Sequence, residues 1–203
     1  MDRMSPTRIG RAAVLKEFLV RQELEALFKH ALSLERAFET AQVYDPSRAQ
    51  AEHRRARVTL NTGAFHGLIV DRIIFHLRWI LRALGHPYFD VSRVESQLTA
   101  STDGDYFRTH NDNTHANFPR RELSYVCFFH HEPRPFDGGE LLIHDALERG
   151  GVEEPIAVRK RIVPEQGAMV VFPSACLHEV LPVRCSSRAF ADSRFTLNGW
   201  LHR

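Results

Sequence analysis

The spacing of apolar side chains predicts two helices in the first part of the chain. Residues 22–36 place leucine, phenylalanine and alanine mostly three or four positions apart, and residues 65–84 repeat this spacing more strongly. Asn61 or Thr62 can cap the start of the second helix, and Gly85 is typical of a helix end. These two segments are therefore expected to pack with one apolar face each against a core.

The residues around and between the helices have a different pattern. Residues 13–19 form a short, partly apolar stretch that we expect to enter the fold as a strand. Residues 44–58 contain the turn signal Asp45-Pro46-Ser47 and several basic side chains. This composition predicts an exposed loop, either solvated or able to recognise an acidic partner.

After residue 90 the pattern becomes that of short strands separated by turns. About eight segments with apolar or alternating side chains predict strands: residues 94–101, 106–112, 123–129, 140–144, 156–163, 167–172, 177–183 and 194–201. Such a series is typical of an antiparallel sandwich or barrel. We therefore expect an α+β, mainly β fold, in which a double-stranded β-helix (jelly roll) is buttressed by N-terminal helices. One domain would span residues 1–203, with 1–90 as mainly helical support and 91–203 as the jelly-roll core.

Composition limits the environment and the partners. The chain is 43% hydrophobic and 26% charged, which is typical of soluble globular proteins. A net charge of +2 gives no reason to expect nucleic acid, and no apolar run approaches the roughly 20 residues of a membrane span. Three cysteines and a polar start at residues 1–10 favour a reducing, cytoplasmic location without a secretory signal. The sequence does not predict an oligomeric state.

Three residues could form a metal site. His110 and Asp112 lie two positions apart in a strand-like segment, so their side chains point to the same face. With His178 from a later apolar segment they would supply two imidazoles and one carboxylate, a set that binds iron(II) and leaves coordination positions open. Taken singly, each signal is weak, because a surface turn beside a histidine explains the first pair and a core histidine explains His178.

A cationic side chain follows on the last predicted strand. Arg194, Thr196, Asn198 and Trp200 share one face of that strand. An arginine buried there without a partner would be costly, whereas a bound carboxylate would form a bidentate ion pair with it. Thr196 could add a hydroxyl hydrogen bond. The alternative is that Arg194 points to solvent.

Taken in order, these residues resemble the iron(II)- and 2-oxoglutarate-dependent oxygenases, and among them the prolyl-4-hydroxylase-like branch. Further motifs carry the resemblance over residues 94–202: Phe136-Asp137-Gly138-Gly139-Glu140-Leu141, Pro173-Ser174 through His178-Glu179-Val180-Leu181-Pro182-Val183, and Arg194-Phe195-Thr196-Leu197-Asn198-Gly199-Trp200. As an ordered set they are specific, although each is short.

The resemblance implies roles for the candidate residues. His110, Asp112 and His178 would be the catalytic iron ligands, and Arg194 would bind the distal carboxylate of 2-oxoglutarate beside Thr196. Iron(II), 2-oxoglutarate and molecular oxygen would be required, with ascorbate as an optional cofactor. The metal and its co-substrate would carry the oxidation, and the protein would supply placement and a dry pocket.

The sequence departs from the family at two points. Family members usually place the arginine nine or ten residues after the distal histidine, a position that Arg188 holds here, whereas Arg194 lies sixteen residues away. Arg194 is preferred because it opens a strand, while Arg188 lies in a turn-like stretch. Phe128 stands where relatives often have a tyrosine that contacts 2-oxoglutarate, and Tyr125 or Tyr106 could replace it.

The expected function is hydroxylation of an unactivated C–H bond, with a prolyl residue of a peptide or protein as the first candidate by family resemblance. Hydroxylation of a small molecule or natural product, a non-catalytic metal- or 2-oxoglutarate-binding sensor, and a zinc hydrolase are the alternatives. The complete set of His110, Asp112, His178 and Arg194 argues against the last two.

Overall fold

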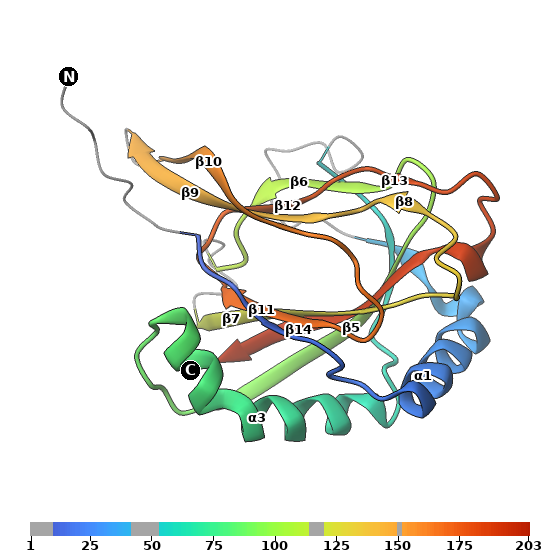
Figure 1. The fold of residues 1–203 in the computed structure, drawn as a ribbon, viewed down its shortest axis with the longest axis horizontal. Helices are drawn as coiled ribbons and strands as arrows, with labels where there is room; N and C mark the ends of the chain where they lie inside the picture. Colours follow the sequence, from blue (N-terminus) through green and yellow to red (C-terminus); the bar gives the residue numbers. More distant parts are fainter. Residues whose placement is uncertain (1–9, 42–52, 114–119, 150–151) are drawn as a thin grey trace.

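A computed structural model describes residues 10–41, 53–113, 120–149 and 152–203, and two sheets dominate it (Figure 1). The seven-stranded sheet has the order β1 (Ala13–Leu15), β11 (Met169–Pro173), β7 (Arg121–Phe129), β14 (Arg194–His202), β5 (Arg93–Ser101), β4 (Arg57–Thr59), β2 (Glu39–Thr40). The five-stranded sheet has the order β10 (Val152–Ile162), β9 (Leu141–Arg149), β12 (His178–Val180), β6 (Tyr106–His110), β3 (Arg54–Arg55). A two-stranded ribbon pairs β13 (Val183–Arg184) with β8 (Asp137–Gly138).

Two helices cover the outer face of the seven-stranded sheet. These are α1 (Arg21–Ser33) and α3 (Phe65–Leu84), and short 3₁₀ turns lie at Glu35–Ala37 and Phe190–Asp192. In Figure 1 both helices lie on one side of this sheet, with the five-stranded sheet on the other side. The helices therefore buttress the roll and leave the space between the sheets for a site.

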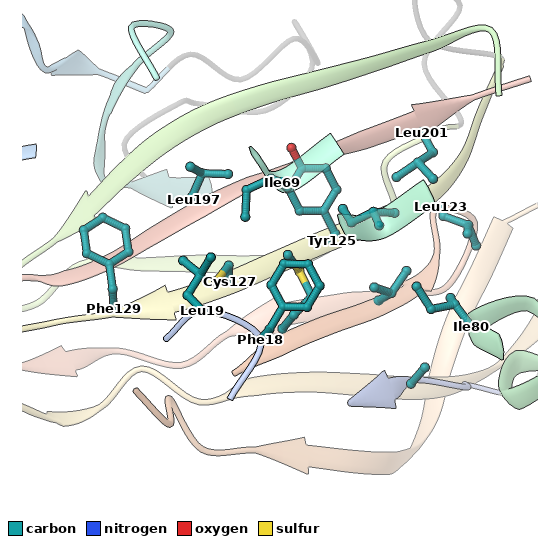
Figure 2. Packing of buried hydrophobic residues seen from close by; sticks show 14 of the residues in the cluster. Phe18, Leu19, Ile69, Ile80, Leu123, Tyr125, Cys127, Phe129, Leu197 and Leu201 are labelled. Atoms are coloured by element: carbon teal, nitrogen blue, oxygen red, sulfur yellow. The ribbon is translucent and has the colours of Figure 1, made fainter. Parts of the chain in front are cut away.

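The largest core cluster lies between the helices and the seven-stranded sheet. Ile69 and Ile80 of α3 are fully buried with Leu123 and Tyr125 of β7 and Leu201 of β14 (Figure 2). Gly85 ends α3 in a left-handed conformation with φ of 60°, which glycine adopts without a Cβ clash. The apolar stripe thus fixes which face of α3 is buried and which faces outward.

A second, smaller cluster joins the two sheets. Phe128, Val170 and Phe172 of the seven-stranded sheet pack with Leu141 and Ile143 of β9. Together with the helix-covered outer face, this arrangement confirms the predicted jelly roll with supporting helices. The prediction that residues 1–203 form one domain remains a prediction.

Several local predictions were wrong. Residues 44–52 of the expected loop at 44–58 lie outside the described residues, but Arg54–Arg55 and Arg57–Thr59 are strands that join different sheets. Neither Asn61 nor Thr62 caps α3, whose N-cap is Ala64 without a side-chain hydrogen bond. The expected count of about eight strands was too low, because β2, β3, β8 and β13 are two-residue strands that a sequence pattern cannot reveal.

Among the described residues, none of the helices combines the length and the hydropathy required to span a bilayer.

Candidate active site

The pairing of β6 with β12 brings the two candidate histidines together. His110 and His178 stand opposite each other in this ladder, and their ring centroids are 4.1 Å apart. The register then shifts, so that Val180 pairs with Phe107. Because of this shift, the Phe107 ring stacks on the His110 ring with centroids 3.5 Å apart. This irregularity in the strand pairing therefore positions the His110 imidazole and places an aromatic ring against it.

Asp112 follows β6 and joins the histidines. Its backbone N–H donates to the Ser174 carbonyl at 2.8 Å, which fixes the chain after the strand. One carboxylate oxygen lies 3.6 Å from Nε2 of His110 and the other lies 3.5 Å from Nε2 of His178. One candidate ligand atom from each residue lies within 4.8 Å of the others. The structure thus brings together the three residues that the sequence singled out.

Backbone carbonyls set the orientation of both imidazole rings. Nδ1 of His110 donates to the Arg108 carbonyl at 2.8 Å, and Nδ1 of His178 donates to the Cys176 carbonyl at 2.9 Å. With the proton on Nδ1, the lone pair is on Nε2, on the side where Asp112 lies. Metal-binding histidines are typically oriented by such a hydrogen bond from the other ring nitrogen.

The protonation states suit a divalent metal. Burial and the neighbouring His178 hold the pKa of His110 well below its ordinary value of 6.5, so this imidazole is neutral. Burial raises the pKa of Asp112, but electrostatic interactions with His178 and His110 and hydrogen bonds from Ser124 and Trp200 outweigh this effect and lower the pKa below 3.8. Neutral imidazoles and an ionised carboxylate are the forms that ligate iron(II).

Side chains outside the triad hold the carboxylate. The Ser124 hydroxyl donates to Asp112 at 2.6 Å and lies 2.9 Å from the Ser174 hydroxyl. Trp200, the other hydrogen-bonding partner of Asp112, has its ring covered by the Arg121 guanidinium at 3.5 Å from the centroid. The sequence analysis did not assign Ser124 or Arg121 to the site.

Arg194 is a buried cation at the start of β14. Its side chain is 3% exposed, its Nε donates to the Gly139 carbonyl at 2.7 Å, and its guanidinium lies 5.0 Å from the centroid of Phe128. Burial lowers its pKa to about 10, which leaves it charged at neutral pH. Within the described part of the chain, no carboxylate forms an ion pair with it. The nearby Glu140 carboxylate favours the charged form of Arg194 but is itself ion-paired with Arg161. The buried guanidinium therefore still favours an anionic ligand, because a buried charge without a direct counter-ion is costly.

Arg188 has the opposite environment. It lies in the connection before β14, its side chain is 77% exposed, and it pairs with Asp103 at 3.1 Å. Arg194, in contrast, lines the same cavity as His110, Asp112 and His178. The geometry therefore agrees with the choice of Arg194 over Arg188 as the cation that faces the triad.

Comparison with known proteins identifies the family. The 2OG-Fe(II) oxygenase superfamily matches residues 96–202, which include the triad and Arg194. The chain belongs to this superfamily. Iron(II) and 2-oxoglutarate are its metal and co-substrate, and the donor set described above fits both.

Two relatives with similar sequences are PKHD-type hydroxylases. The oxygenase is 39% identical over 140 residues to an uncharacterized PKHD-type hydroxylase of Synechocystis sp., covering 69% of this chain and 46% of the relative. A PKHD-type hydroxylase of Synechococcus sp. is 32% identical over 112 residues, covering 55% and 43%. The chain therefore spans less than half the length of these relatives.

The solved structures show the shared fold. A prolyl-4-hydroxylase of Pseudomonas putida superposes with a TM-score of 0.66 at 22% identity, covering 96% of this chain and 93% of that one. A prolyl hydroxylase of Trichoplax adhaerens, in complex with a hypoxia inducible factor peptide fragment, has a TM-score of 0.69 at 13% identity and covers 94% and 83%.

The remaining predicted residues of the oxygenase differ in placement. Thr196 is buried in the cavity wall two residues after Arg194, and its hydroxyl donates to Oδ1 of Asn198 at 3.1 Å. Tyr106 also lines the cavity, with the Arg108 guanidinium 5.5 Å from its ring centroid. Both residues are therefore near enough to the cavity for a ligand contact.

Tyr125 requires a correction. It borders the cavity, but its side chain belongs to the core cluster on the helix side of the sheet (Figure 2). There the hydroxyl donates to the Glu95 carbonyl at 2.9 Å and lies 2.5 Å from the Ser96 hydroxyl. The predicted contact between Tyr125 and 2-oxoglutarate does not fit this orientation.

The sequence analysis also missed a polar wall of the oxygenase cavity. Gln97 and Thr99 of β5 line the cavity together with Asn198 of β14, and the Thr99 hydroxyl donates to Asn198 at 2.8 Å. Gln97 is 8% exposed, and its Nε2 has no hydrogen-bond partner among the described residues. The alternation of polar and apolar residues along residues 97–101 was the available signal for these positions.

Proposed function

We propose that this protein is an iron(II)- and 2-oxoglutarate-dependent hydroxylase that acts on an unactivated C–H bond, with a prolyl residue of a peptide or protein as substrate. The observation that carries the proposal is the convergence, in one cavity, of a His-Asp-His triad and a buried arginine that has no ion-pair partner among the described residues. A metal site alone would not need the arginine, whereas 2-oxoglutarate needs both.

The protein residues would have distinct tasks. His110, Asp112 and His178 would hold the iron, and Arg194 would bind the distal carboxylate, with Thr196 beside it. When bound, iron and 2-oxoglutarate supply the oxidising equivalent for inserting oxygen into the C–H bond, and succinate and carbon dioxide are released. Phe172 and the ring of Phe107 would limit water around the ligands.

The choice of a prolyl substrate rests on likeness. Both solved structures described above are named as prolyl hydroxylases, and one of them was determined with a peptide fragment. Tyr106, Phe107 and Arg54 border the triad in the cavity and would lie nearest to a substrate. Aromatic rings beside the metal suit a saturated ring such as proline, and a peptide would extend from there across the cavity opening.

The first experiment tests the chemistry. The protein is purified anaerobically, ferrous iron is added, and the weak visible charge-transfer band is followed as 2-oxoglutarate is titrated. Succinate release is then measured with oxygen, with and without proline-containing peptides and free amino acids. A band together with peptide-dependent succinate supports the proposal. Absence of the band refutes it, and a band without succinate under any condition indicates a sensor. Succinate release that increases only with a free amino acid, and not with peptides, refutes the proposal that the substrate is a peptide or protein.

A pair of arginine variants tests the anchor. Arg194→Ala should weaken 2-oxoglutarate binding by at least about 2 kcal/mol, or roughly 30-fold, because it removes a buried charged hydrogen-bonding partner. Arg188→Ala is the matched control and should change the affinity less than about twofold, because this side chain is exposed and bound to Asp103. The reverse ranking, read from the same titration, would contradict the assignment of Arg194.

A further inference from the structure

The face of helix α3 opposite its buried stripe is not covered by any described element. Three large apolar side chains point outward: Phe75 is 82% exposed, Trp79 is 52% exposed and Ile74 is 44% exposed. In Figure 1, α3 lies at the lower margin of the molecule with the seven-stranded sheet above it. Large apolar side chains grouped in this way typically mark an interaction surface.

Charged residues complete this outward face. At about 100° of rotation per residue, Asp71, Arg78 and Arg82 fall on the same stripe as Phe75, with Ile74 and Trp79 along its two borders. Among the described residues, none of the three charged side chains forms an ion pair. We call these six residues the α3 outer face: Asp71, Ile74, Phe75, Arg78, Trp79 and Arg82.

The α3 outer face is complementary to itself. Its residues are placed symmetrically about the point between positions 76 and 77: Asp71 mirrors Arg82, Ile74 mirrors Trp79, and Phe75 mirrors Arg78. A two-fold axis at this point would lay two copies of α3 antiparallel. On the central stripe Asp71 would then face Arg82 and Phe75 would face Arg78 of the other copy, as an isologous interface requires. Ile74 and Trp79 lie on opposite borders of the stripe, and each border would lie beside the same border of the other copy.

Each of these pairs joins compatible chemistry. Asp71 with Arg82 is a carboxylate–guanidinium pair, which can form two parallel hydrogen bonds. Phe75 with Arg78 places a guanidinium on an aromatic ring, while Ile74 and Trp79 bury apolar surface along the two edges of the contact. In a parallel arrangement or with a shifted register, the like charges of Arg78 and Arg82 would approach each other or leave Asp71 unmatched.

We infer that two copies of this protein associate through the α3 outer face in an antiparallel, two-fold symmetric dimer. One helix per copy buries less than the roughly 800 Å² per partner of a standard stable interface, so the dimer is weak and depends on concentration. The α3 helices lie on the far side of the seven-stranded sheet from the candidate active site. Both cavities therefore stay accessible, and this inference does not depend on the proposed function.

Sedimentation velocity over a range of concentrations tests the interface. The wild-type protein should shift from 23.4 kDa towards twice that mass as its concentration rises to about 1 mM. Phe75→Glu should remain a monomer. Val158→Glu is the matched control, because it also replaces an exposed apolar side chain, 53% exposed on β10, with a carboxylate, and it should behave as wild type. A wild-type monomer throughout this range would overturn the inference, as would equal loss of the dimer in both variants.

Charge exchange identifies the occupant as a second copy. Asp71→Arg and Arg82→Asp should each be monomeric, because each creates two like-charge contacts across the axis. An equimolar mixture of the two variants should dimerise, since each then meets its opposite charge, and the double variant should recover self-association. Circular dichroism confirms that each variant is folded. Failure of both the mixture and the double variant to associate would refute the antiparallel pairing and point to a different partner for this face.

Discussion

Gly139 shows how closely the backbone approaches the buried cation. Its φ is +67°, and a Cβ at this position would lie 2.5 Å from Cδ and 3.0 Å from Nε of Arg194. Its carbonyl accepts the hydrogen bond from that same Nε. The second glycine of the Asp137-Gly138-Gly139 segment is therefore required both by the backbone conformation and by the space that the arginine occupies.

Gly139→Ala should weaken 2-oxoglutarate binding, because the added methyl group displaces the Arg194 side chain. We expect a loss of about tenfold, or roughly 1.4 kcal/mol, in isothermal titration of the metal-loaded protein. Gly104→Ala is the control: its φ is also positive, at +78°, but the nearest atom to its Cβ is Nη1 of Arg55 at 3.6 Å. Both variants lose about 1–2 kcal/mol of stability from backbone strain. Equal co-substrate affinities in the two variants would contradict the steric argument.

At the scale of elements, one ion pair joins the two supporting helices. Arg72 of α3 donates to Glu23 of α1 at 2.5 and 2.8 Å, and both side chains are partly buried. Glu23 also accepts the backbone N–H of Val20 at 2.9 Å and so closes the start of α1. The hydrogen bond from Arg72 lowers the pKa of Glu23 below 4.5.

Glu23→Ala should therefore lower the free energy of unfolding by about 1–3 kcal/mol, because it removes the cap at the start of α1 and the carboxylate partner of Arg72, which then keeps only the Phe18 carbonyl among the described residues. Glu25→Ala on the same helix is the matched control. Glu25 pairs with Arg21, whose side chain is 90% exposed, and such pairs contribute about 0.5 kcal/mol or less. Urea unfolding at pH 7 measures both, and similar losses in the two variants would show that the pair does not join the helices.

The elements differ in how well the sequence predicted them. The existence of α3 (Phe65–Leu84) and its end were predicted, because apolar periodicity and a terminal glycine are local signals, whereas the capping residues expected for it placed its start too early. β3 and β4 were not predicted, because they exist only through pairing with distant strands, as in Arg54 with Phe107 and Arg57 with Ala100. Local patterns contain no information on such partners.

The same distinction applies to the site. The two-residue spacing of His110 and Asp112 and the alternation after Arg194 correctly indicated which side chains share a cavity. Phe107 was missed because a register shift places it beside His110, against simple alternation. Tyr125 was misplaced although the signal existed: three positions from the inward Phe128, it must point to the opposite face of β7.

At the scale of the whole molecule, buried histidines make stability depend on pH. Burial lowers the pKa of both His130 and His202 below 6.5. Below pH 6.5 the unfolded chain then binds more protons than the folded chain, so the free energy of unfolding falls as pH falls towards the folded pKa values. The stability from each residue is fully present above pH 6.5.

The His130→Gln/His202→Gln variant should therefore show a shallower loss of stability with acidification than wild type. Each histidine can contribute up to about 1.4 kcal/mol per pH unit within its window. Urea unfolding of both proteins at pH 7.5, 6.5 and 5.5, with a chelator present, measures the two slopes. Parallel curves would show that neither histidine is protonated more easily on unfolding.

The two halves of the candidate active site belong to strands of unequal support. β14, which carries Arg194, is paired along its length with β5 on one side and β7 on the other. β6, which carries His110, has two aligned residue pairs with β12 and two with β3. Local opening should therefore begin at β6, so that amide protons there exchange with deuterium before those of β14. Without metal, the protein would therefore keep Arg194 in place while the strand that carries His110 fluctuates.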